Sequence, residues 1–103
     1  MSISERQMEL IQESAKLLMK DLLISHEESI QIVVAALKKQ LAAKNLTMEA
    51  INSRSRSDRT SFIRSVVYEV QQTIENNKNY YPKNLTKTIE DFYKILHHSW
   101  TEE

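Results

Sequence analysis

The sequence lacks cysteine and glycine and contains one proline. The absence of cysteine excludes disulfide scaffolds, thiolate zinc sites, iron–sulfur clusters and thiol catalysis. Without glycine, it excludes motifs built on a glycine turn, such as P-loops, dinucleotide-binding fingerprints and nucleophile elbows. The longest apolar run is residues 32–37, whereas a membrane span needs about 20 residues. The N-terminus shows no signal-peptide pattern, so we expect a cytoplasmic protein without a transmembrane segment.

Apolar residues recur at helical spacing in four long stretches, and no stretch alternates as a strand does. We expect helices at about 5–24, 26–44, 59–76 and 84–100, and a further short helix at about 46–52. The expected core positions are Met8, Ile11, Ala15, Leu17, Leu18, Met19, Leu22, Leu23, Ile24, Ile30, Val33, Val34, Leu37, Leu41, Phe62, Ile63, Val66, Val67, Val70, Ile74, Leu85, Ile89, Phe92, Leu96 and Trp100. This pattern predicts one all-α domain over residues 1–103, folded as an antiparallel four-helix bundle.

Helix starts are marked by side chains that cap backbone amides. Ser4 with Gln7 and Ser25 with Glu28 read as capping boxes. Thr47 can cap the short helix, and residues 52–58 read as an exposed polar turn. We expect Ser57 or Asp58, at the end of that turn, to cap the next helix.

The charges are unevenly distributed, although 14 basic and 14 acidic residues give a formal net charge of zero. Residues 31–65 carry seven basic and two acidic residues. The seven basic residues are Lys38, Lys39, Lys44, Arg54, Arg56, Arg59 and Arg64. This block can be an anion-binding surface at a helix N-terminus, or a solvated polar turn whose arginines pair with nearby acidic residues.

One hypothesis for the basic block is DNA binding. Residues 46–51 resemble the first helix of a helix-turn-helix, and residues 59–64 resemble its recognition helix. The nucleic-acid-binding candidates are then Arg54, Arg56, Arg59, Thr60 and Arg64, since arginine reads guanine and hydroxyls hold phosphates. Two features count against this hypothesis: the turn lacks glycine, and no apolar residue lies between Ile51 and Phe62 to pack the two helices.

A second hypothesis is an aromatic contact surface for a protein partner, because six of the seven aromatic residues lie beyond residue 67. Tyrosine and tryptophan combine apolar area with a hydrogen-bonding group, which suits interfaces. The alternative is that Phe92 and Trp100 are core and the tyrosines cover the bundle. The histidines form no metal-binding or catalytic pattern, so we predict a protein without enzyme activity, cofactor or metal.

The helices resemble those of pediocin-like (class IIa) bacteriocin immunity proteins. LLMKDLLISHEES at 17–29 resembles the end of the first family helix and its turn. IQIVVAALKKQLAAKN at 30–45 resembles the second helix, and residues 62–96 resemble the third and fourth with their polar connection. Residues 53–58 depart from this pattern.

This resemblance implies a four-helix bundle that protects a bacterium from its own bacteriocin. Family members recognise the complex of bacteriocin and sugar-permease receptor inside the cell and block pore formation, with specificity in the C-terminal half. In this chain the resemblance implies specificity around Tyr93, His97 and Trp100. Together with Tyr80 and Tyr81 of the aromatic contact surface, these are the candidate partner-binding residues. The alternatives are a small DNA-binding regulator that uses residues 46–65, and a phage- or plasmid-borne inhibitor of a host protein.

Overall fold

The computed structural model describes residues 5–101, apart from the side chains of Arg6 and residues 99–101. This part of the chain contains five helices and no strand. The helices are α1 (Glu5–Leu22), α2 (His26–Lys44), α3 (Met48–Asn52), α4 (Arg56–Glu75) and α5 (Leu85–Thr101). The predicted all-α bundle is confirmed, and the short helix expected at about 46–52 is present as α3.

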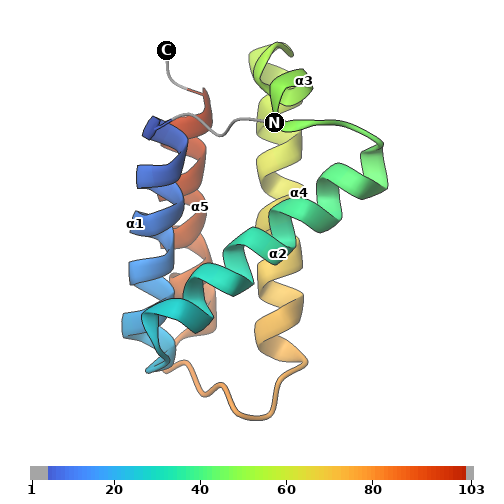
Figure 1. Cartoon of the computed structure of the whole chain (residues 1–103). Coiled ribbons are helices and arrows are strands. Elements are labelled where there is room, and N and C mark those ends of the chain that lie inside the picture. Colours follow the sequence, from blue (N-terminus) through green and yellow to red (C-terminus); the bar gives the residue numbers. More distant parts are fainter. Residues whose placement is uncertain (1–4, 102–103) are drawn as a thin grey trace.

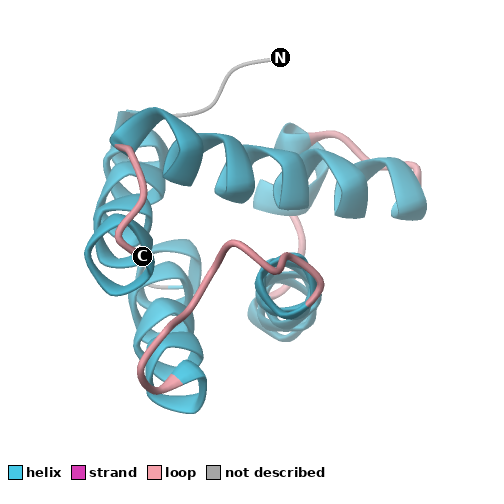
Figure 2. Cartoon of the chain, turned by 90° about the horizontal axis from the view of Figure 1, so that it is seen from below, coloured by secondary structure: helices cyan, strands magenta, loops and turns pink. Residues whose placement is uncertain are grey.

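The four long helices form a closed ring in which α1 contacts α2, α2 contacts α4, α4 contacts α5 and α5 contacts α1. Figure 1 shows α5 running antiparallel to both α1 and α4. Helix α2 departs from this upright arrangement and crosses α1 and α4 obliquely, so that it lies along one side of the bundle in Figure 2. The loop at residues 76–84 crosses the lower end of the molecule from α4 to α5.

The core lies inside this ring and takes residues from all five helices. Its buried members include Ile11, Ala15, Leu18, Val33, Leu37, Met48, Ile51, Phe62, Ile63, Val66, Val70, Ile74, Phe92 and Leu96. The stripe predicted on α4 is fully buried, because residues at spacings of three and four share one face of a helix. Burial of valine-rich positions on a helix confirms that the spacing, and not the strand propensity of valine, decides the structure here.

Two positions expected in the α1 stripe are exposed. Met8 is 42 % exposed and Leu23 is 90 % exposed, so both predictions are wrong. At the start of α1, Gln7 and Leu10 are buried instead, because Gln7 faces α3. The side-chain amides of Gln7 and Asn52 bond to each other in both directions, at 2.6 and 3.3 Å, which ties α3 to α1.

The buried face of α2 is rotated relative to the predicted one. Ile32 and Ala36 are buried, whereas Ile30 and Val34 are half-buried. Because α2 crosses its neighbours obliquely, its contact line follows a different row of side chains from that of an upright helix. Residues 32–37 are apolar on nearly every side of the helix, so the sequence does not indicate which of the two rows is buried.

Helix α1 ends in a left-handed turn at Leu23, whose φ is 56°. The amide of Ile24 donates a hydrogen bond to the carbonyl of Met19 at 3.3 Å, which is the closing bond of a Schellman motif. Asn45 occupies the same position at the end of α2, with φ 54°. Asparagine tolerates this conformation, but leucine is strained in it by roughly 1 kcal/mol.

Helix α4 begins earlier than predicted. Ser55 is its N-cap, and its hydroxyl accepts a hydrogen bond from the amide of Asp58 at 3.2 Å. The expected caps, Ser57 and Asp58, lie inside the first turn, so this prediction is wrong. A row of serines offers several cap residues, and the sequence alone does not distinguish between them. The link between α3 and α4 is therefore short, residues 53–55.

The other predicted caps have the expected partners. The hydroxyl of Ser25 accepts from the amide of Glu28 at 3.0 Å, and that of Thr47 accepts from the amide of Ala50 at 3.1 Å. Asn84 caps α5 in the same way, through the amide of Lys87 at 3.1 Å. Ser4 lies outside the described residues.

Candidate functional site

The tyrosines predicted to contact a partner do not form one surface. Tyr80 lines a hollow at the N-terminus of α2, Tyr81 lines a second hollow between α1 and α5, and Tyr93 lines a third between α4 and α5. His97 stacks on Tyr93. The side chain of Trp100 lies outside the described residues.

The third hollow belongs to a surface that joins parts of both predicted sites. We call it the α4–α5 face and define it by Thr60, Arg64 and Tyr68 of α4 with Tyr93 and His97 of α5. These residues meet because the two helices pack antiparallel, which places the start of α4 beside the end of α5 (Figure 1).

The side chains of the α4–α5 face are held by direct contacts. The guanidinium carbon of Arg64 lies 5.4 Å from the centre of the Tyr93 ring. The rings of Tyr93 and His97 are stacked, with centres 5.0 Å apart and planes inclined by 28°. On the other side of His97, its Nε2 lies 3.2 Å from the hydroxyl oxygen of Thr60. One row of contacts therefore runs from Arg64 to Thr60 and crosses between the helices.

Beside this row lies a shallow hollow of about 360 Å³, whose lining includes Arg64, Tyr68 and Tyr93. Tyr68 is 59 % exposed. It lies one helical turn after Arg64, so the two side chains share the solvent-facing side of α4. Tyr68 is one of the six aromatic residues beyond residue 67, but it is not among the site residues predicted from the sequence. The Arg64–Tyr68 spacing is the signal that could have done so.

The electrostatic surroundings of His97 are cationic. Burial lowers the pKa of His97, and Arg56, Arg64 and His98 lower it further by repelling the imidazolium form. A neutral imidazole has one donor and one acceptor nitrogen, so His97 can exchange a hydrogen bond with Thr60 in either direction. The cations gather around His97, whereas the adjacent hollow is lined by one cation, Arg64, and one anion, Glu90.

The remaining nucleic-acid-binding candidates lie above this face, at the start of α4. Arg54 and Arg56 are exposed, and Arg59 is half-buried. Only Thr60 and Arg64 of the five predicted residues belong to the α4–α5 face. The five candidates do lie at one end of the molecule, because they follow one another through the α3–α4 link and the first half of α4.

The structure answers one of the two objections to a helix-turn-helix, the packing of its helices, whereas the turn still lacks glycine. The link has three residues, 53–55, a length that such units use. Met48 and Ile51 of α3 are buried in the same core cluster as Phe62. Apolar residues on either side of the polar stretch therefore pack α3 on α4, although none lies within the stretch.

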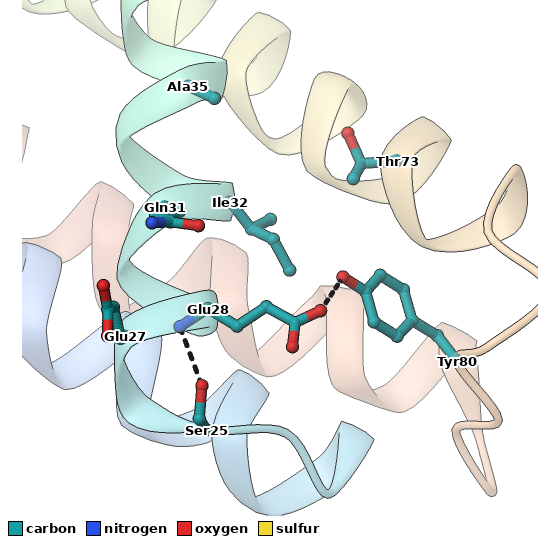
Figure 3. Close-up of a pocket in the computed structure, with 8 residues that line it drawn as sticks. All are labelled: Ser25, Glu27, Glu28, Gln31, Ile32, Ala35, Thr73 and Tyr80. Atoms are coloured by element: carbon teal, nitrogen blue, oxygen red, sulfur yellow. Dashed lines mark hydrogen bonds between the residues drawn. The ribbon is translucent and has the colours of Figure 1, made fainter.

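Tyr80 has a different environment (Figure 3). Its hydroxyl donates a hydrogen bond to the carboxylate of Glu28, beside Thr73 of α4. This bond fastens the 76–84 loop to the first turn of α2. The hydrogen bond to Glu28, burial and the charge of Glu28, in that order, raise the pKa of Tyr80 to about 12. Tyr80 is therefore a protonated donor at neutral pH, with a structural partner inside the chain.

The described residues contain neither a metal-binding cluster nor a helix suited to span a membrane. No three His, Asp or Glu side chains in this part of the chain gather closely enough to hold a metal ion. None of the helices within residues 5–101 combines the length and apolar content that crossing a membrane requires.

Comparison of the chain with protein-family models, with curated proteins and with solved structures finds no match. The resemblance of its helices to bacteriocin immunity proteins therefore stays a prediction.

Proposed function

We propose that this protein acts by binding a protein partner through the α4–α5 face, without catalysing a reaction. The observation that carries the proposal is the row of contacts from Arg64 through Tyr93 to His97, beside the exposed ring of Tyr68. Arginine and tyrosine are enriched at protein interfaces and supply much of their binding energy.

The arrangement suits binding because its side chains are already ordered. Stacking fixes Tyr93 and His97, and the Tyr93 ring restrains Arg64, so less conformational entropy is lost when a partner docks. Tyr68 offers apolar area with a hydroxyl at its tip. The cations around His97 favour a partner whose contact surface is acidic.

The proposal is tested by comparing the proteins that co-purify with four baits in the organism that carries this gene. The baits are the wild type, Arg64→Ala, Tyr68→Ala and a control, Lys16→Ala, whose exposed side chain lies on α1. A partner of the α4–α5 face is lost from both face variants and kept by the control. Equal recovery with all four baits contradicts the proposal.

Bacteriocin immunity is the specific form of this function that the sequence supports. The bundle of four long helices agrees with the fold that the resemblance implies, and Tyr93 and His97 of the implied specificity region belong to the α4–α5 face. A sensitive strain that expresses the chain is challenged with a panel of pediocin-like bacteriocins. We expect protection against at least one, and its loss in Tyr93→Ala at unchanged helicity. Sensitivity to the whole panel rejects immunity but leaves other protein partners open.

DNA binding is the second candidate, favoured by the three-residue link and the packing of α3 on α4. Anisotropy of labelled mixed-sequence duplex DNA is measured at low and high salt with wild type and with the double variant Arg54→Ala/Arg56→Ala. Phosphate contacts predict affinity that falls steeply with salt. Binding that the double variant loses, and that Lys16→Ala/Lys78→Ala keeps, favours a regulator. Absence of binding rejects this candidate.

A further inference from the structure

The lower end of the molecule carries a second hollow, of about 620 Å³, between the end of α1, the start of α5 and the loop at residues 76–84. Its volume lies in the range of sites that hold a ligand or a few side chains of a peptide. It shares no lining residue with the α4–α5 face. A ligand in this hollow therefore contacts none of the residues that define the α4–α5 face.

The rim of this hollow presents apolar side chains to solvent. Leu23 is 90 % exposed and Tyr81 is 80 % exposed, and both line the hollow together with the half-buried Leu17. Leu23 also has a left-handed backbone, a conformation for which the chain uses asparagine at the end of α2. A leucine at this position is unfavourable for the isolated chain in both backbone conformation and solvation. Contact with a partner would remove the second of these costs.

The lining of the same hollow has one positive charge in excess, since it contains three lysines and two aspartates. Asp21 accepts a hydrogen bond from the hydroxyl of Thr88 at 2.7 Å, and Asp91 pairs with Lys87 at 3.1 Å. Lys20 and Lys83 also line the hollow. Neither makes an ion pair or a hydrogen bond with a carboxylate among the side chains that the structure describes.

We infer that this hollow binds an acidic peptide segment of a partner protein. An apolar side chain of the segment packs against Leu17, Leu23 and Tyr81, and its carboxylates pair with Lys20 and Lys83. Charge complementarity selects this occupant, because the lining has one positive charge in excess and Lys20 and Lys83 lie in the same hollow as the exposed apolar side chains. Specificity comes from the lysines, and affinity comes from the apolar contact.

The test is a selection of displayed random dodecapeptides on the immobilised full chain, with removal of those that also bind Lys20→Glu/Lys83→Glu. The selected peptides are then labelled, and their affinities are measured by fluorescence anisotropy. We expect sequences in which Asp or Glu flanks an apolar residue, bound roughly tenfold more weakly by the charge-reversed variant. The control Lys16→Glu/Lys94→Glu makes the same change of charge on lysines outside the hollow and should bind as wild type does.

Leu23→Asn provides a second variant, because asparagine keeps the left-handed turn and removes the apolar side chain. We expect several-fold weaker peptide binding at an unchanged or raised melting temperature. The proposal is overturned by enrichment of peptides without acidic residues, by equal losses in the Lys16/Lys94 control, or by unchanged affinity of Leu23→Asn. The proposal is also overturned if no peptide is selected and the chain instead binds anionic phospholipid vesicles or associates with itself as its concentration rises. If Leu23→Asn abolishes that binding or self-association, the occupant of the hollow is a lipid surface or a second copy of the chain.

Discussion

The guanidinium group of Arg64 lies over the ring of Tyr93, 5.4 Å from its centre, and so joins α4 to α5 at the surface. A contact of this kind at an exposed site contributes about 0.5–1 kcal/mol. We therefore expect Arg64→Ala to lower the free energy of unfolding by at most about 1 kcal/mol, as measured by urea titration. A much larger loss would show that Arg64 supports the fold, and binding defects of this variant would then not report on the α4–α5 face.

The bond between Tyr80 and Glu28 predicts an effect on stability that depends on pH. Because Tyr80 is partly exposed, we expect Tyr80→Phe to cost about 1 kcal/mol at neutral pH. Its folded-state pKa is raised to about 12 from an ordinary value near 10. The stabilisation is therefore complete below pH 10 and is lost as the pH rises through 12.

Urea titrations of wild type and Tyr80→Phe, at neutral pH and at about pH 11 to 12, test whether their free energies of unfolding become equal at high pH. The difference in stability between wild type and Tyr80→Phe should shrink as the pH rises. A difference that stays constant up to pH 12 would mean that the hydroxyl of Tyr80 does not donate to Glu28 in solution.

His97 predicts a dependence on pH in the acidic direction. Burial and the cations of Arg56, Arg64 and His98 lower its pKa in the folded chain, so the unfolded chain binds this proton more readily. Stability must then fall as the pH drops below about 6.5, the usual pKa of histidine. We expect His97→Gln to lose less stability than wild type between pH 7 and pH 5.5. Parallel losses in the two proteins would contradict the lowered pKa of His97.

Substitution of two serines, Ser55 and Ser57, tests which residue caps the N-terminus of α4. Ser55 is the N-cap and holds the amide of Asp58 at 3.2 Å, whereas Ser57 is exposed in the first turn. We expect Ser55→Ala to cost about 1 kcal/mol and Ser57→Ala to be nearly neutral. Urea titrations of the two variants decide between the caps, and the reverse ranking would place the start of α4 where the sequence analysis expected it.

Much of the fold follows from the sequence, because residues such as Ile63, Val66, Val70 and Ile74 can share one face only on a helix. The orientation of α2 does not follow, since its central run is apolar on nearly every side. The exposure of Leu23 does not follow either, because the helix was predicted to continue past Leu22, and a residue just beyond a helix end no longer shares the buried face.

The candidate site was less predictable than the fold. Arg64 and Tyr93 are far apart in sequence and belong to two different hypotheses, one for nucleic acid and one for a protein partner. Only the antiparallel packing of α4 on α5 brings them together. Tyr80 and Tyr81 are adjacent in sequence, yet they line different hollows. Sequence adjacency in a loop does not determine which side of the loop each ring occupies.

The most direct test of the α4–α5 face as a binding surface is photo-crosslinking in the organism that carries this gene. A photoreactive phenylalanine analogue replaces Tyr68, which is 59 % exposed, and a second version of the protein carries it at Lys16. We predict one discrete covalent protein adduct from position 68, weakened when Arg64→Ala is added, and none of that mass from position 16. Crosslinks to nucleic acid, or the same adducts from both positions, would contradict a protein-binding α4–α5 face.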